Sequence, residues 1–243
     1  MDTVEHRWLN NRQKQLQWCD LDSLALWNNN MKNADTRRIL EVNGWDRADA
    51  ITYRFNSHGF RCDEFTDQPG VLTLGCSFTG GVALPEDTIW PSLVAQQLNL
   101  KLWNLGVGAA SMDSCFRLLN HYITRLNVCM VLILTPSPGR FEMFTPDNKT
   151  QWIVPGANTP NDYQKMWYSS DQNSVQNFSK NIMAIRYLCH VNRVKLVEKD
   201  SFADLMTVPG LSDTVRSVDR GRDLRHSGVL SHKLCADLFL STI

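Results

Sequence analysis

The sequence predicts an α/β protein with a three-layer, doubly wound and mainly parallel sheet, preceded by an appended N-terminal segment. From Val71 onward, short apolar runs alternate with stretches of helical periodicity, a pattern typical of a parallel sheet covered by helices. The preceding part has a different character, because residues 1–66 contain four of the eight tryptophans and a dense mixture of charges. We therefore expect an N-terminal extension, residues 1–66, that packs on a main domain formed by residues 67–243.

One strand and one turn are predicted in the extension. Residues 51–55 alternate in polarity like a half-buried strand, and the run 56–59 (Asn-Ser-His-Gly) has the composition of a turn. We expect these residues to form a hairpin with Phe60 and Arg61 that leads into the main domain.

The main domain is predicted to have a β-α-β-α-β-α-β-α order, which right-handed crossovers build into a parallel sheet. Because ligands bind at the carboxyl ends of the strands in such sheets, reactive groups are expected in the loops that follow them. The expected strands are 71–74, 100–103, 128–134 and 194–197; the expected helices are 87–98 with Asp87 as N-cap, about 111–126 with Ser111 or Asp113 as N-cap, 175–190 and 229–240.

Composition and charge argue against several classes of function. The 25 basic and 25 acidic side chains balance, so the chain lacks the basic surface that a nucleic-acid partner requires. No apolar run is long enough for a secretion signal or a membrane span, so we expect a cytoplasmic protein without a membrane partner. The seven cysteines and six histidines are scattered without the spacings of a zinc site, and we expect no metal.

The loop after the first predicted strand, residues 75–81 (Gly-Cys-Ser-Phe-Thr-Gly-Gly), places Ser77 in a sharp glycine-rich turn. A serine there can present its hydroxyl above the sheet, and its own N–H can help to stabilise an oxyanion. The same composition also suits a plain turn or a phosphate-binding loop. A phosphate-binding loop needs Lys-Ser or Lys-Thr after the last glycine, where this chain has Val82 and Ala83. The G-x-S-x-G elbow of α/β-hydrolases does not match either, since the glycine after Ser77 comes one residue late.

A second candidate segment lies just before the last predicted helix, where Asp223 and His226 are three residues apart. If the segment makes one turn, the two side chains emerge on the same side. Asp223 then accepts the Nδ1 hydrogen of His226 and leaves Nε2 free to take a proton from Ser77. A surface helix cap uses the same residue types, so this pattern alone is weak.

Taken together, the two segments resemble the SGNH-type (GDSL-like) hydrolases, whose hallmarks are a Gly-x-Ser-x-Thr block after the first strand and an Asp-x-x-His block before the last helix. Residues 75, 77, 79, 223 and 226 carry the resemblance, which covers about 70–243. It implies a flavodoxin-like SGNH fold and a catalytic triad in which Ser77 is the nucleophile, His226 the base and Asp223 its orienting partner. No cofactor is implied.

The resemblance also implies two further oxyanion donors, at which this sequence departs from the family pattern. After the second strand, spacing from Asn104 assigns the backbone donor to Ala109, with Gly108 one residue early. After the third strand the expected asparagine is absent, and either the Ser137 hydroxyl or the Arg140 guanidinium takes its position. Thr79 and Arg140 are also candidate substrate contacts.

The expected function is therefore that of a serine esterase acting on a carboxylic ester of a small molecule or carbohydrate, with an acetyl ester on a sugar as the first substrate to test. Two alternatives stay open: a binding module that kept the fold while losing activity, and an O-acyltransferase that uses the same serine. A nucleotide-binding fold is disfavoured, because the partial fingerprint Gly106-x-Gly108-x-x-Ser111 lacks its last glycine.

Overall fold

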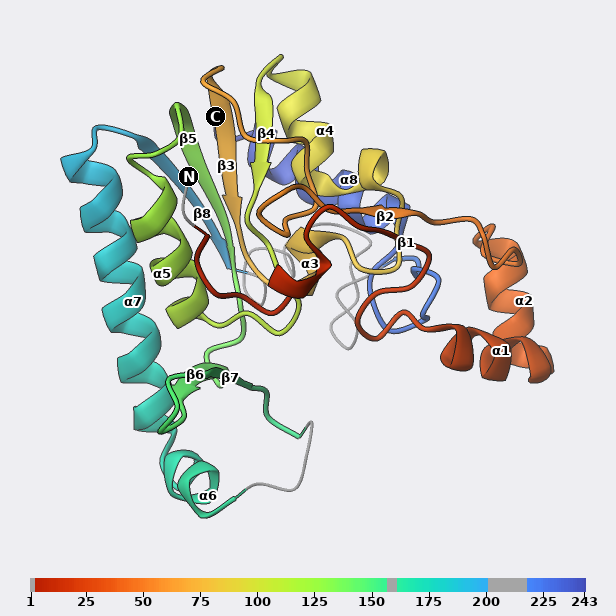
Figure 1. Ribbon diagram of the computed structural model, residues 1–243. Coiled ribbons are helices and arrows are strands. Elements are labelled where there is room, and N and C mark those ends of the chain that lie inside the picture. Colours follow the sequence, from red (N-terminus) through yellow and green to blue (C-terminus); the bar gives the residue numbers. More distant parts are fainter. Residues whose placement is uncertain (1–2, 157–160, 201–217) are drawn as a thin grey trace.

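A four-stranded parallel sheet forms the centre of the part of the chain that the structure describes. The computed structural model describes residues 3–156, 161–200 and 218–243. The strand order is β4-β3-β5-β8, and every neighbouring pair is parallel (Figure 1). The bounds are β3 Gly70–Leu74, β4 Lys101–Asn104, β5 Val128–Thr135 and β8 Lys195–Asp200.

Helices cover both faces of this sheet. Helices α4 (Trp90–Gln97) and α8 (Val229–Leu240) pack on one face, whereas α5 (Met112–Tyr122) and α7 (Asp171–Val191) pack on the other (Figure 1). Strand residues alternate between the two cores, as the pleat requires: Leu72 and Leu74 belong to one hydrophobic cluster and Val71 to the other. The predicted three-layer, mainly parallel α/β fold is confirmed.

Two predicted helix starts can be compared with the observed caps. Asp87 does not cap α4, because it lies in a separate 3₁₀ turn, Glu86–Thr88, and the helix begins after Ile89. Ser111, not Asp113, is the N-cap of α5. Its hydroxyl accepts the Ser114 N–H, and the Ser114 side chain bonds back to the N-cap backbone, which completes a capping box.

The N-terminal segment forms its own small elements: a 3₁₀ turn (Leu9–Asn11), β1 (Gln15–Leu16), α1 (Leu24–Lys32), α2 (Ala34–Val42) and β2 (Tyr53–Arg54). The predicted hairpin between 51–55 and Phe60-Arg61 is wrong, since β2 pairs antiparallel with β1 instead. The Asn56 carboxamide oxygen accepts the N–H groups of His58 and Phe60, both at 3.0 Å, and closes a compact turn, while the Phe55 N–H bonds to the Lys14 carbonyl beside β1.

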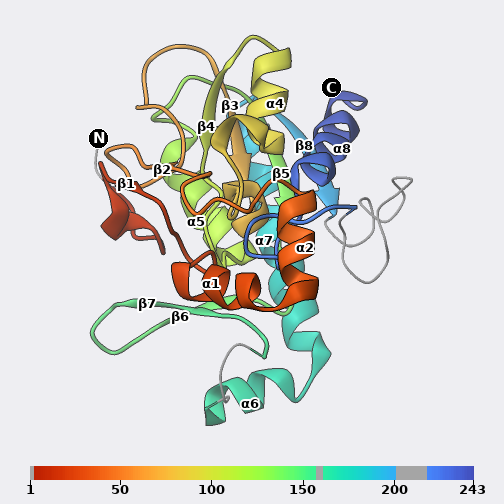
Figure 2. The same cartoon turned by 90° about the vertical axis from the view of Figure 1, so that its right-hand side faces the viewer.

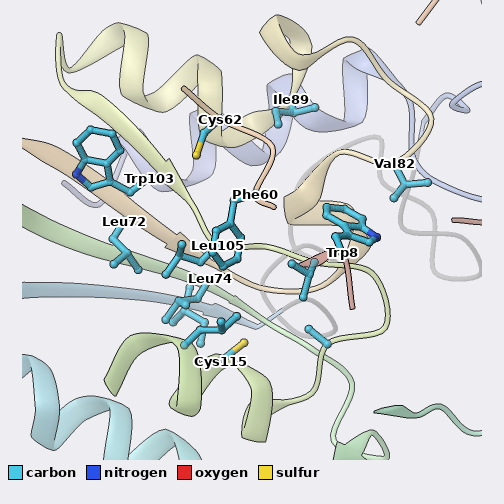
Figure 3. Packing of buried hydrophobic residues seen from close by; sticks show 14 of the residues in the cluster. Trp8, Phe60, Cys62, Leu72, Leu74, Val82, Ile89, Trp103, Leu105 and Cys115 are labelled. Carbon is cyan, nitrogen blue, oxygen red and sulfur yellow. The ribbon is translucent and has the colours of Figure 1, made fainter. Parts of the chain in front are cut away.

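Part of the N-terminal segment shares a core with the sheet. Trp8 and Phe60 are 3% and 0% exposed and belong to the same hydrophobic cluster as Leu74 and Leu105, as Figure 3 shows. Helices α1 and α2 lie farther out, on the same side of the sheet as α4 and α8 (Figures 1 and 2). Cys19, Leu40 and Tyr53 belong to the same cluster, so the N-terminal segment contributes to this core from several places along its length.

The connection after β5 folds at the carboxyl edge of the sheet. It contains an antiparallel hairpin, β6 (Phe141–Phe144) with β7 (Thr150–Ile153), followed by α6 (Asp162–Tyr168) (Figure 1). Among the described residues, no helix has the length and apolar character needed to cross a bilayer.

Candidate active site

Ser77 is held at the carboxyl end of β3 by a turn that requires glycine. It is the first residue of the short helix α3 (Ser77–Gly80). Gly75 has φ +152°, and a Cβ there would lie 2.1 Å from Thr79 Oγ1 and 2.9 Å from the Leu134 carbonyl oxygen. Because no side chain fits, the backbone can turn out of the strand within two residues and present Ser77 at the sheet edge.

The Asp223-to-His226 segment makes the single turn that the spacing predicts. Leu224 has φ +56°, which bends the chain sharply. Asp223 Oδ1 accepts the backbone N–H groups of Arg225 and His226, both at 2.9 Å. These bonds fix the carboxylate and direct its second oxygen toward the His226 ring.

The three predicted side chains meet in one hydrogen-bonded chain. His226 Nδ1 lies 2.5 Å from Asp223 Oδ2, and His226 Nε2 lies 2.9 Å from Ser77 Oγ. The Asp223 side chain is fully buried and that of His226 is 14% exposed. The arrangement is that of a serine nucleophile, a general base and an acidic residue that orients the base.

Burial and charge act on the two titratable groups in opposite senses. Burial alone would raise the pKa of the Asp223 carboxyl, but its hydrogen bond to His226, the imidazolium charge and the two backbone N–H groups outweigh this and lower it. Burial alone would lower the pKa of His226, but Asp223 outweighs it and raises it. The shifts favour an ionised Asp223 and a protonated His226, each of which stabilises the charge of the other.

The backbone donors expected for an oxyanion are placed at the same edge. In the described part of the chain, neither the Ser77 N–H nor the Ala109 N–H donates to a protein acceptor. Ala109 has φ +59°, a conformation that glycine adopts without strain, which fits its position in the motif. A Cβ on Gly108 would lie 1.6 Å from Asp20 Oδ2, so this position has no room for a side chain. Of the two candidates, Ala109 borders the cavity beside Ser77 and Gly108 does not.

The candidates for the third donor and for substrate contacts differ in whether they line the cavity beside Ser77. Arg140 borders the cavity of Ser77, whereas Ser137 is not among its lining residues. Arg140 Nη1 donates to the Ala110 carbonyl at 3.5 Å. Thr79 is fully buried, packs against Gly75 and is not among the residues that line this cavity.

Cys76, the neighbour of the nucleophile, is influenced by the same arginine. Burial would raise the pKa of its thiol, but the Arg140 guanidinium and the Phe78 N–H outweigh this and lower it. The His226 ring nevertheless bonds to the Ser77 hydroxyl and not to the thiol.

A cavity of about 180 Å³ opens over Ser77 and His226, and the N-terminal segment forms one of its walls. This contribution was not predicted from the sequence, in which nothing connects an N-terminal acid or arginine with Ser77. The lining residues are Arg7, Asp20, Leu21, Ser77, Ala109, Arg140, Val154 and His226.

Two of the residues that line this cavity, Arg7 and Asp20, form an ion pair. Arg7 Nη2 lies 3.0 Å from Asp20 Oδ1, and Trp8 Nε1 donates to Asp20 Oδ2 at 3.2 Å. Asp20 has φ +60° and its side chain is 8% exposed. The carboxylate is thus compensated on both oxygens, and the Arg140 guanidinium has no carboxylate partner among the described residues.

A larger cavity of about 560 Å³ lies elsewhere and does not include the triad. Trp167 borders this cavity with Phe141 and Tyr163. Trp152 and Tyr168, which belong to the same connection between β5 and α7, border neither of these two cavities. Across the described residues, no group of three or more His, Cys, Asp or Glu side chains could hold a metal ion.

Comparison with known proteins gives matches among solved structures alone: no family model and no curated protein matches the sequence. The chain is similar to a lipolytic protein of the G-D-S-L family from Desulfitobacterium hafniense, with 13% identity over 72% of this chain and 99% of the other and a TM-score of 0.37. It is similar to the esterase EstA from Pseudoalteromonas sp., with 13% identity, coverage of 71% and 94% and a TM-score of 0.37. It is also similar to the acetyl xylan esterase AlAXEase, with 16% identity, coverage of 72% and 99% and a TM-score of 0.38. These neighbours include the family whose motifs the sequence resembles, and at such identities the activity has to be argued from the site.

Proposed function

We propose that this chain is a serine hydrolase that cleaves carboxylic esters, with Ser77 as nucleophile, His226 as general base and acid, and Asp223 as the group that orients His226. The observation that carries the proposal is the continuous hydrogen-bonded chain from Asp223 Oδ2 through His226 to Ser77 Oγ, with distances of 2.5 Å and 2.9 Å. No metal or cofactor takes part in this mechanism.

In the acylation step, Ser77 Oγ attacks the ester carbonyl carbon while its proton passes to His226 Nε2. The carbonyl oxygen becomes an oxyanion, for which we propose the N–H groups of Ser77 and Ala109 and the Arg140 guanidinium as donors, because all three residues line the cavity. When the tetrahedral intermediate collapses, the alcohol leaves with the proton held on Nε2. An acyl group then remains on Ser77.

Deacylation repeats the sequence with water as the nucleophile. His226 Nε2 takes a proton from the water as it attacks the acyl carbon, and returns it to Ser77 Oγ as the acid is released. Asp223 stays ionised throughout, because its lowered pKa and its two backbone donors favour the carboxylate.

The size and lining of the cavity favour a short acyl group. About 180 Å³ is available beside Ser77, with Leu21 and Val154 as apolar walls and Arg7, Asp20 and Arg140 as polar ones. An acetyl ester of a polyhydroxylated alcohol, such as a sugar, fits this combination. The alcohol would face the Arg7–Asp20 pair, which can both donate and accept hydrogen bonds.

Covalent labelling by a fluorophosphonate tests the nucleophile directly. We expect the intact mass of the protein to rise by one adduct, which is absent in Ser77→Ala and retained in the matched neighbour Cys76→Ala. Hydrolysis of p-nitrophenyl acetate should follow the same pattern. A protein that takes no adduct and hydrolyses no short ester would contradict the proposal and favour a binding module.

A second experiment, with p-nitrophenyl acetate as acyl donor, separates hydrolysis from acyl transfer. In the presence of a sugar acceptor, mass spectrometry of the acceptor measures how much of the acyl group goes to the alcohol and how much to water. Predominant transfer would replace the esterase assignment by that of an O-acyltransferase acting through Ser77.

A further inference from the structure

A buried ion pair joins the N-terminal segment to the turn that carries Asp223 and His226. Arg222, the residue directly before Asp223, is 0% exposed, and its partner Asp22 is 1% exposed. Arg222 Nε donates to Asp22 Oδ1 at 3.1 Å, and Nη2 donates to Oδ2 at 2.6 Å. This two-pronged geometry fixes direction as well as distance.

The N-terminal segment holds the rest of the guanidinium too. Arg222 Nη1 donates to the Ala48 carbonyl at 2.7 Å, and Nη2 also donates to the Gln17 carbonyl. The guanidinium carbon lies 3.8 Å from the centre of the Trp18 ring. Any other rotamer of Arg222 would leave a buried cation without these partners, so the chain position next to Asp223 is fixed.

Asp22 is linked at the same time to the loop that follows the nucleophile. The Tyr53 hydroxyl donates to Asp22 Oδ2 at 2.6 Å and accepts the Ala83 N–H at 2.7 Å. The Ala83 carbonyl in turn accepts the Arg222 N–H at 3.0 Å. A closed circuit of hydrogen bonds, Asp22 to Tyr53 to Ala83 to Arg222, therefore connects the segment after Ser77 with the acid–base turn.

Stability alone does not account for such a circuit. A buried ion pair regains its desolvation cost only in part, and apolar side chains of similar volume are often at least as stabilising. What the ion pair adds is orientation. The Ser77–His226 contact joins segments 149 residues apart, and a misplacement of about 1 Å in such a site can lower the rate about 10²-fold.

We propose that Asp22, Tyr53 and Arg222 form a positioning network that holds the Asp223–His226 turn against Ser77, an inference that rests on the proposed function of those residues. The N-terminal segment is then a working part of the catalytic apparatus. Its contribution is a fixed geometry and not a reacting group.

Tyr53→Phe tests the network with the smallest change, because it deletes one hydroxyl from the circuit and keeps the buried ring. Tyr122→Phe is the matched control: this tyrosine is also fully buried, and its hydroxyl bonds to His58 at 3.2 Å, outside the circuit. Asp22→Asn is the stronger variant. The measurements are the rate of fluorophosphonate labelling of Ser77, kcat and KM for p-nitrophenyl acetate, and the midpoint of thermal unfolding.

We expect Tyr53→Phe to lower the labelling rate and kcat about tenfold with KM unchanged, and Asp22→Asn to lower them about 10²-fold. Tyr122→Phe should lose similar thermal stability and keep both rates. If Tyr53→Phe and Tyr122→Phe have equal labelling rates and equal kcat values, the positioning role is overturned. This comparison holds even if Asp22→Asn fails to fold. A wild-type protein that takes no label would instead overturn the proposed function, and the network's role with it.

Discussion

Replacement of Asp223 by asparagine should remove nearly all activity without disturbing the turn. The Oδ1 atom of the new side chain can still accept the Arg225 and His226 N–H groups, which lie 2.9 Å away in the structure. The amide nitrogen then replaces Oδ2 and faces His226 Nδ1. Because an amide NH₂ donates, Nδ1 becomes the acceptor and the ring proton moves to Nε2, where it points at Ser77 Oγ. The imidazole can no longer accept the serine proton.

The expected loss follows from this change of tautomer. Substitution of the same kind in a serine protease triad lowers kcat by about 10⁴, which corresponds to about 5 kcal/mol of transition-state stabilisation. We expect a loss of that order in kcat for p-nitrophenyl acetate, with KM little changed. Asp219→Asn is the control, since this carboxylate caps α8 through the Leu230 and Ser231 N–H groups and does not face His226. An Asp223→Asn variant that keeps more than a tenth of wild-type kcat would refute the assignment of His226 as base.

Three further predictions concern charge and acidity. The pH profile of kcat/KM should fall on acidification through a His226 pKa raised above its ordinary value, because only the neutral ring accepts a proton; a pH-independent rate between pH 5 and 8 would contradict this. Arg140→Gln should lower kcat about 10²-fold while Ser137→Ala leaves it unchanged; the reverse order in a p-nitrophenyl acetate assay would assign the third oxyanion donor to Ser137. Burial lowers the pKa of His6 to about 4 and that of His232 to about 3. Below about pH 6.5 the unfolded chain therefore binds more protons than the folded chain. Urea unfolding should show that the free energy of unfolding falls by about 1.4 kcal/mol per pH unit for each histidine between pH 6 and 4.5. His232→Gln should reduce that slope, and an unchanged slope would show that acid unfolding has another cause.

The central sheet could be predicted from the sequence because its signals are local. The run that begins at Val71 is short and apolar at three of its four positions, and the segments after it alternate between apolar runs and helical periodicity. Four predicted strands agree with β3, β4, β5 and β8 to within three residues at each end. The Asp223-to-His226 turn could be predicted for the same reason, since three residues of spacing suffice to place both side chains on one side.

Contacts between segments that are distant in the chain could not be predicted, because no local sequence pattern indicates them. Strand β2 pairs with β1, about 38 residues earlier in the chain. This pairing depends on the packing of Trp8 and its neighbours in the core and not on the turn after Phe55. The contact between Asp20 and Gly108 also joins distant segments. A Cβ at position 108 would lie 1.6 Å from Asp20 Oδ2, which explains why glycine is needed there. The spacing of the motif, by contrast, assigns the donor to Ala109. In both cases sequence separation exceeds the reach of any periodic pattern.

The charges around Ser77 fit the proposed mechanism, although the asparagine expected as the third donor is absent. Asp20 brings a carboxylate to the edge of the cavity, where an unpaired negative charge would oppose the oxyanion. Arg7 lies 3.0 Å from one of its oxygens and Trp8 Nε1 3.2 Å from the other, so that charge is compensated within the N-terminal segment. Arg140 remains as the cation of the cavity without a carboxylate partner among the described residues, and a partly enclosed guanidinium gains most from an anion that forms beside it. The negative charge that develops on the carbonyl oxygen supplies that anion in the transition state and not in the ground state, which is the condition for an interaction to raise kcat.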